Sequence, residues 1–186
     1  MPGLNLTRTE AQERAEIVSG ASYDVRLDLT SGEETFRAHT VIEFEATEGA
    51  STFLDAITRS VDRVTLNGTE LDANEVADGE RIRLENLSAN NRVEIESEMI
   101  YMNTGEGLHR FVDPVDGEVY LYSQFEVPDC RRTFPVFEQP DLKAPFTFRI
   151  TAPAHWQVVS NQPTPEPTEI DAVSYTHLRA HETPEH

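Results

Sequence analysis

The feature that most constrains this chain is a two-residue alternation of apolar and polar side chains that begins near residue 22. It runs through residues 23–30 and returns through residues 36–45, with Ser31 and Gly32 as the turn between them. Successive side chains of a strand point to opposite faces, so this pattern predicts a long antiparallel hairpin with one buried face. A mainly β protein is therefore expected.

Shorter segments of the same kind follow, separated by turn residues such as Asn67-Gly68. They are residues 52–54, 63–66, 81–84, 92–102, 146–150 and 156–159. Residues 103–117 are polar and rich in glycine, and they are expected to form a loop. Strands at this spacing predict an antiparallel β-sandwich or a saddle-like arrangement of sheets.

One helix is expected, over residues 4–19 at the N-terminus. Thr7 and Glu10 have the spacing of a capping box. Its apolar stripe is thin and consists of Ala11, Ala15 and Val18. We therefore expect residues 1–20 to be a helix docked on the β domain.

The β domain is expected to span residues 21–172. After it the composition shifts, and residues 173–186 hold three of the six histidines and continue no strand pattern. They resemble the read-through tail of a truncated sequence-assembly product, and we interpret them as unrelated to the domain.

Charge and cysteine content exclude several classes of protein. Thirty-four acidic residues against fifteen basic ones give a formal net charge of −19, which argues against nucleic acid or an anionic membrane as a partner. Cys130 is the only cysteine, so an internal disulfide is impossible and a reducing compartment is the default. Without a signal segment or an apolar run of about 18 residues, a cytoplasmic protein is expected.

The nucleophiles and metal-binding side chains form no complete catalytic set. His177 and His181 are four residues apart, but the zinc-peptidase motif H-E-x-x-H needs a glutamate where this chain has Leu178. The remaining candidates are isolated in sequence and are expected to have structural or surface roles: His39, His109, His155 and Cys130.

A second polar pattern lies at residues 119–126. Alternation places one set on the inner side of a strand, namely Val119, Leu121, Ser123 and Phe125, and the opposite set on the outer side, namely Tyr120, Tyr122, Gln124 and Glu126. Prolines at 128, 135, 140 and 145 then prevent a long regular element. This pattern suggests the wall of a site, although an ordinary solvated strand face fits the spacing as well.

The run from Ser123 to Phe146 resembles the M1 zinc aminopeptidases of the aminopeptidase N type. It contains Q-F-E, C-R-R and F-P, followed by a triplet at Glu138 and then K-A-x-F. The likeness covers about residues 4–170. It implies the saddle-shaped N-terminal domain of such an enzyme, truncated before the catalytic domain.

The resemblance implies a role for two residues. Glu126 would bind the free α-ammonium group of a peptide substrate, because a carboxylate holds an ammonium strongly at a desolvated site, and Gln124 would line the pocket for the first side chain. The zinc ligands and the catalytic residues would lie on the following domain. This fragment would hold no catalytic residue, bind no zinc and cleave nothing by itself.

Two further expectations follow. Arg131 and Arg132 should hold the loop by pairing with acids such as Asp129 or Glu138. The face around Tyr120, Tyr122 and Phe134 should be apolar and exposed, because it would pack on the missing catalytic domain.

The sequence departs from the family pattern at Glu138-Gln139-Pro140, where many members have D-E-P, and at Val136, which replaces a frequent cysteine. Neither position coincides with Gln124 or Glu126. The alternative function is a non-catalytic β-sandwich interaction module. An H-E-x-x-H motif about 100–200 residues downstream in the reading frame would favour the enzyme.

Overall fold

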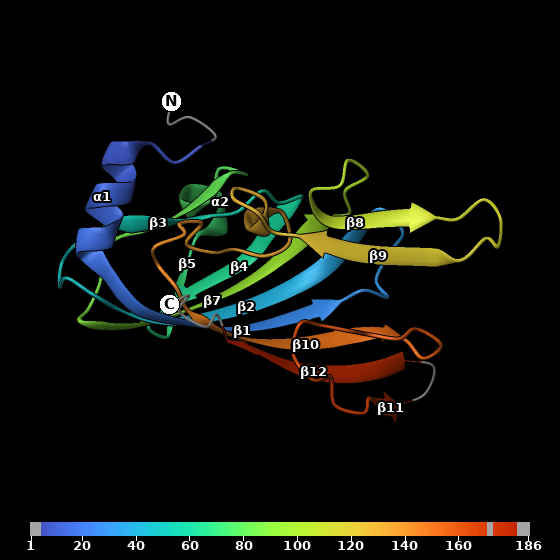
Figure 1. Ribbon diagram of the computed structural model, residues 1–186. Helices are drawn as coiled ribbons and strands as arrows, with labels where there is room; N and C mark the ends of the chain where they lie inside the picture. Colours follow the sequence, from blue (N-terminus) through green and yellow to red (C-terminus); the bar gives the residue numbers. More distant parts are fainter. Residues whose placement is uncertain (1–4, 171–172, 182–186) are drawn as a thin grey trace.

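The computed structural model describes residues 5–170 and 173–181, and strands dominate this part of the chain (Figure 1). The large sheet contains β1 (Val18–Asp28), β2 (Thr35–Ala46), β4 (Ser60–Leu66), β5 (Thr69–Leu71), β7 (Asn90–Ile100), β10 (Pro145–Pro153), β11 (Thr168–Ile170) and β12 (Val173–His181). Two small sheets are formed by β3 (Thr52–Asp55) with β6 (Arg81–Leu84) and by β8 (Gly107–Val112) with β9 (Val119–Gln124). The helical elements are α1 (Arg8–Ile17), α2 (Ala73–Val76) and the 3₁₀ turn η1 (Cys130–Arg132).

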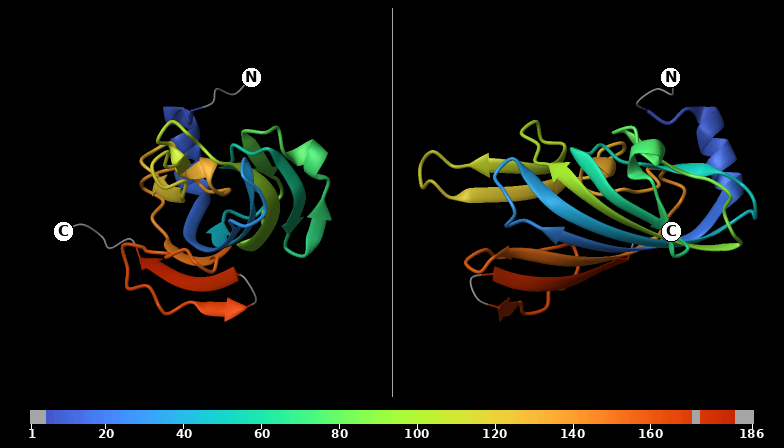
Figure 2. Two further views of the ribbon diagram at one scale, coloured as in Figure 1. Left: turned by 90° about the vertical axis from the view of Figure 1, so that its right-hand side faces the viewer. Right: turned by 180° about the vertical axis from the view of Figure 1, so that it is seen from behind.

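The large sheet has the strand order β11-β12-β10-β1-β2-β7-β4-β5. The hairpin of β1 and β2 is confirmed, with Leu27 opposite Ala38. Among the described strands, every pair is antiparallel except β1 with β10, where Tyr23 lies opposite Phe146. Figure 2 shows the sheet curving beneath the small sheets and the η1 loop.

The core lies between the large sheet and the segments that cover it. Buried side chains come from the sheet, from β3 and β6, and from the loop after η1; the fully buried examples include Val25, Phe36, Ile42, Leu54, Ile82, Ile95 and Phe134. The loop after η1 is therefore part of the domain's interior.

Two of the expected segments differ from the sequence-based prediction. The expected loop 103–117 contains strand β8, which pairs with β9 from Gly107 opposite Gln124 to Val112 opposite Val119. Backbone pairing with β9, the second strand of the same hairpin, outweighs the polar composition of this segment. Residues 156–159 form no strand, because the Trp156 N–H donates to the Pro153 carbonyl at 2.9 Å and closes a turn.

Residues 173–181 form strand β12, so the finding of no strand pattern there was wrong for these residues. They pair antiparallel with β10, from Pro153 opposite Val173 to Pro145 opposite His181. Without β12, β10 would be an edge strand with unpaired N–H and C=O groups. Such backbone groups can pair with a wide range of sequences. The interpretation of 173–186 as an unrelated tail stays a prediction, and residues 182–186 lie outside the described residues.

Helix α1 begins with the expected capping box, since the Glu10 N–H donates to Thr7 Oγ1 at 3.3 Å and the Thr7 N–H donates to Glu10 Oε2 at 2.8 Å. The expected apolar stripe is wrong. Ala15 is exposed, Val18 begins β1, and the one buried residue of the helix is Arg14. Polar contacts therefore dock this helix.

Candidate functional site

The candidate site is the end of the β8–β9 hairpin together with the loop that follows it. Along β9 the alternation holds as far as Tyr122: Leu121 packs against the core, while Tyr120 and Tyr122 are half exposed. It ends at Ser123, which was expected on the inner side and is exposed. Just after the strand, Phe125 packs against the core. The strand ends at Gln124. Glu126 therefore stands on the turn after the strand, before the cis peptide bond that precedes Pro128.

Cross-strand pairing extends the outer face of the hairpin. His109 lies opposite Tyr122, and Phe111 lies opposite Tyr120. The His109 and Tyr122 rings are stacked with centroids 4.6 Å apart, and the Gly105 N–H donates to His109 Nδ1 at 3.0 Å. His109 is isolated in the sequence, and its neighbours become apparent only from the register of β8 with β9.

Gln124 is fixed between two parts of the loop. Its Nε2 donates to Asp129 Oδ2 at 3.2 Å, and its Oε1 accepts a hydrogen bond from the Glu126 N–H. The amide thus ties Glu126 to Asp129. A turn held at both ends keeps the Glu126 side chain in a restricted region at the end of the hairpin.

The three carboxylates between residues 124 and 138 have different surroundings. Asp129 is buried and accepts hydrogen bonds from Gln124 and Arg132. Glu138 is buried and accepts the Arg131 N–H at 2.6 Å. The Glu126 carboxylate is exposed, and no donor from the described residues contacts it. Of these three described carboxylates, it is the one that is open to an external cation.

The two arginines hold the loop, as expected, and each contacts an acid: the Arg132 side chain donates to Asp129, and the Arg131 backbone N–H donates to Glu138. Arg132 Nε donates to Asp129 Oδ1 at 3.0 Å, and its Nη2 lies 3.4 Å from Glu106 Oε2. The Arg131 side chain is buried, and its Nε donates to the Pro128 carbonyl at 2.9 Å. Both arginines therefore contact the loop close to Glu126.

A buried polar cluster lies behind this loop. Asp55 accepts hydrogen bonds from Arg14 Nη1 at 2.7 Å and from the Glu138 N–H at 3.1 Å. Burial raises the pKa of Glu138 to about 7; the Arg131 N–H opposes this rise, and the nearby Asp55 charge adds to it. The Glu138 carboxyl therefore changes its charge near neutral pH.

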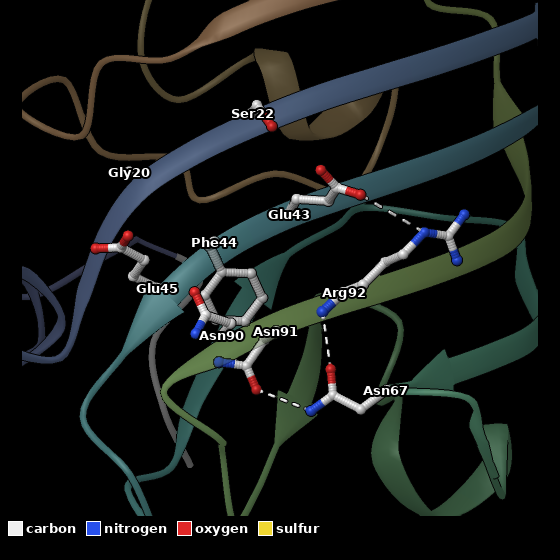
Figure 3. A pocket seen from close by; sticks show the side chains of 9 residues that line it. All are labelled: Gly20, Ser22, Glu43, Phe44, Glu45, Asn67, Asn90, Asn91 and Arg92. Carbon is white, nitrogen blue, oxygen red and sulfur yellow. Dashed lines mark hydrogen bonds and ion pairs between the residues drawn. The ribbon is translucent and has the colours of Figure 1, made fainter.

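A shallow polar pocket lies elsewhere, at the α1 end of the large sheet (Figure 3). It is lined by Gly20, Ser22, Glu43, Phe44, Glu45, Asn67, Asn90, Asn91 and Arg92. Asn67 and Asn91 hydrogen-bond each other, and Asn67 Oδ1 accepts the Arg92 N–H at 2.8 Å. These side chains close the turns at the sheet end, so their polar groups already serve the fold.

No group of three or more His, Cys, Asp or Glu side chains in the described part of the chain is arranged to hold a metal ion. The described helices include none that is long and apolar enough to cross a membrane.

The fold and this hairpin define a class: a β domain that presents an amide and an unpaired carboxylate at the end of an exposed aromatic face. Comparison with known proteins identifies the family. The model of the Peptidase M1 N-terminal domain matches residues 19–183, and the chain belongs to this family.

Relatives and solved structures agree with this assignment. The chain is 51% identical over 173 residues to an aminopeptidase N of Streptomyces lividans, covering 91% of this chain and 20% of that protein. The fold is shared with an aminopeptidase A of Legionella pneumophila in complex with aspartic acid (TM-score 0.73, 16% identity, 87% of this chain and 19% of that one). It is also shared with an M1 zinc metallopeptidase of Deinococcus radiodurans (TM-score 0.69, 18% identity, 88% of this chain and 39% of that one). This chain thus spans about a fifth of the Streptomyces relative.

Proposed function

We propose that this chain is the substrate-binding N-terminal part of a zinc aminopeptidase that releases N-terminal residues from peptides. Glu126 binds the α-ammonium group of the substrate, and Gln124 lines the pocket for the first side chain. Family membership and the names of the relatives, aminopeptidase N and leucyl aminopeptidase among them, support the activity of the whole protein.

The observation that carries the proposal is the unpaired carboxylate of Glu126 beside a fixed Gln124. A carboxylate and an ammonium form charge-assisted hydrogen bonds, which are about twice as strong as neutral ones. An internal peptide segment offers only a neutral amide, and it would leave the carboxylate without a partner. Holding the amine would therefore select the chain end and fix which peptide bond is presented for cleavage.

Zinc would be bound outside this chain. The described residues provide no cluster of metal ligands, and the resemblance puts the zinc ligands on the following domain. We therefore expect the 186-residue chain to cleave no peptide by itself. Incubating it with an aminoacyl p-nitroanilide and Zn²⁺ checks this, since release of nitroaniline would contradict the proposal.

The remainder of the protein would cover the outer face of the hairpin. Of the eight exposed large hydrophobic residues in the described part of the chain, six lie between residues 111 and 127: Phe111, Val112, Val115, Tyr120, Tyr122 and Val127. The expected participation of Phe134 is wrong, because it is fully buried and packs edge-on against Phe125. The exposed aromatic face itself supports a covering domain, since exposed apolar patches are typical of interaction sites.

Dye binding tests this cover. We expect the isolated chain to enhance the fluorescence of an ANS-type dye, and the double variant Tyr120→Ser/Tyr122→Ser to enhance it much less. The matched control is Val159→Ser, which removes an exposed apolar side chain (74% exposed) away from the hairpin. Equal dye binding by the wild-type chain and the tyrosine variant would contradict the idea.

A chimeric enzyme tests the amine site. Residues 1–170 of this chain would replace the corresponding part of the Streptomyces lividans aminopeptidase N, to which the chain is 51% identical. Glu126→Ala should lower kcat/KM for a substrate with a free amine by at least about 30-fold, because truncating one partner of a bound charge pair costs 2 kcal/mol or more.

The control is Glu118→Gln, which removes an exposed acid of the same hairpin. It should leave kcat/KM within about twofold, as is usual for a surface substitution. Kinetics of the Glu126→Ala enzyme that match those of the unmodified chimera would refute the role of this carboxylate.

A further inference from the structure

Helix α1 is docked by an unusual contact. Arg14 has only 1% of its side chain exposed, and its Nη1 donates to Asp55 Oδ2 at 2.7 Å. Its guanidinium lies 4.3 Å from the ring centroid of Phe53 and 5.9 Å from that of Phe137. Burying a charge pair costs desolvation energy that apolar side chains avoid. A helix that only covered the sheet would need no such pair.

The N-terminal segment contacts the loop after Glu126 directly at two points. Asn5 Oδ1 accepts a hydrogen bond from Arg131 Nη2 at 3.1 Å. The Ala11 carbonyl accepts one from Gln139 Nε2 at 2.9 Å. These contacts join parts of the chain that are more than 120 residues apart.

A third connection runs through Asp55. The Asp55 Oδ2 atom that pairs with Arg14 also accepts the Glu138 N–H at 3.1 Å. Glu138 Oε2 in turn accepts the Arg131 N–H at 2.6 Å. Arg14 therefore reaches the backbone of Arg131 through two buried carboxylates.

From Arg131 the contacts continue to the amine site. Arg131 Nε donates to the Pro128 carbonyl at 2.9 Å, within the turn that begins at Glu126. The Asp129 N–H closes this turn on the Glu126 carbonyl at 3.0 Å, and the Asp129 side chain accepts from Gln124. A displacement of Arg131 would thus shift the turn that carries the proposed amine anchor.

We propose that the N-terminal segment of residues 5–17 is a positioning element of the amine site, with Asn5 and Arg14 acting on Glu126 through Arg131 and Glu138. Neither residue touches the substrate. The inference rests on the proposed role of Glu126. The family model begins at residue 19, so this segment lies outside the part of the domain that the model matches.

The test measures kcat and KM separately in the chimeric enzyme. Asn5→Ala removes the acceptor of Arg131, and Arg14→Met removes the buried charge at similar length. Both should raise KM by roughly three- to tenfold with kcat within about twofold, the size expected when one hydrogen bond of ordinary strength is lost. Asn5→Asp keeps an acceptor oxygen and should restore KM.

The matched control is Glu10→Gln, which weakens a different docking contact of α1. Glu10 Oε1 accepts from Arg81 Nη1 at 2.6 Å, and within the described residues Glu10 does not contact the loop after Glu126. It should lower the Tm without changing KM. If Asn5→Ala and Glu10→Gln raise KM in proportion to their loss of Tm, the helix only stabilises the domain and the inference is overturned.

Two further measurements separate the possible failures. If Glu126→Ala leaves KM unchanged, the proposed function fails; if it raises KM while Asn5→Ala does not, the positioning inference alone fails.

Hydrogen exchange in the 186-residue chain is independent of activity. Amides of residues 129–139 should exchange faster in Asn5→Ala than in Glu10→Gln, and equal rates would overturn the inference. Asn5 is exposed, so its variant is expected to fold even if Arg14→Met does not.

Discussion

Replacing Glu138 by glutamine should change how the stability of this chain depends on pH. Burial raises the pKa of Glu138 from its ordinary value of 4.5 to about 7. Between these values the folded state binds a proton that the unfolded state has lost, so the stability from this group falls as pH rises and is gone above about pH 7. One pKa unit is worth about 1.4 kcal/mol, so the whole change amounts to roughly 3 kcal/mol.

Glutamine keeps an acceptor for the Arg131 N–H and carries no charge beside Asp55. The Glu138→Gln variant should therefore gain stability relative to the wild type as pH rises, by about 2–3 kcal/mol between about pH 5 and pH 8. In the difference between the variant and the wild type, the contributions of the other titrating groups to the pH dependence cancel. Glu10, whose pKa is lowered to about 2 mainly by its hydrogen bond with Arg81, loses its contribution only at more acidic pH.

Urea unfolding followed by the fluorescence of Trp156, which packs against the core, measures the free energy at each pH. The control is Glu118→Gln at an exposed site, for which the difference from the wild type should not vary with pH. A stability difference for Glu138→Gln that stays constant from about pH 5 to pH 8 would contradict the raised pKa, because folded Glu138 would then not lose a proton within this range.

Three other changes have expected outcomes. Arg14→Met should lower the free energy of unfolding by about 3–5 kcal/mol, because it leaves Asp55 buried without its charge partner; chemical denaturation measures it. Gly107→Ala should cost about 2 kcal/mol, since Gly107 has φ +59° and a Cβ there would lie 2.7 Å from Arg132 Cβ; a Tm like that of the wild type would contradict this. A chain ending at Ile170 should self-associate in size-exclusion chromatography, because it exposes the edge of β10 that β12 covers.

The parts of the fold that the sequence predicted well are those encoded locally. The alternation of residues 23–45 predicted the hairpin of β1 and β2, and Asn67-Gly68 predicted the turn between β4 and β5. At that turn Asn67 has φ 51° and Gly68 has φ 82°, as a two-residue hairpin loop requires. Period and turn chemistry depend on adjacent residues, so both can be recognised without knowing the fold.

The missed features depend on pairing between strands, which the composition of a single segment does not show. Strand β8 was hidden by a polar composition and exists through its pairing with β9, and β12 exists through its pairing with β10. The outer face of the hairpin gains His109 and Phe111 only once that register is known. Gln124 and Glu126 were selected by the resemblance, since their alternation alone fits any solvated strand face.

Arg14 shows why the buried polar cluster behind the loop could not be predicted from the sequence. An arginine in a helical segment is expected at the surface, and its burial here requires Asp55, 41 residues away. The loop after Glu126 also depends on buried carboxylates. Prolines interrupt it, so it cannot form a strand ladder, and its N–H groups at Arg131 and Glu138 are satisfied by buried carboxylates instead.

This arrangement connects the loop's stability with its charge. The carboxylates that accept the loop N–H groups are buried, and burial is what brings the pKa of Glu138 to about 7. Arg14 and Arg131 supply positive charge to the same cluster. If the cluster holds the turn of Glu126 in place, removing the Arg14 charge should loosen that turn and raise the pKa of Glu138 further. Measuring the pH dependence of stability in Arg14→Met checks this, because the loss of stability should then extend to a higher pH than in the wild type.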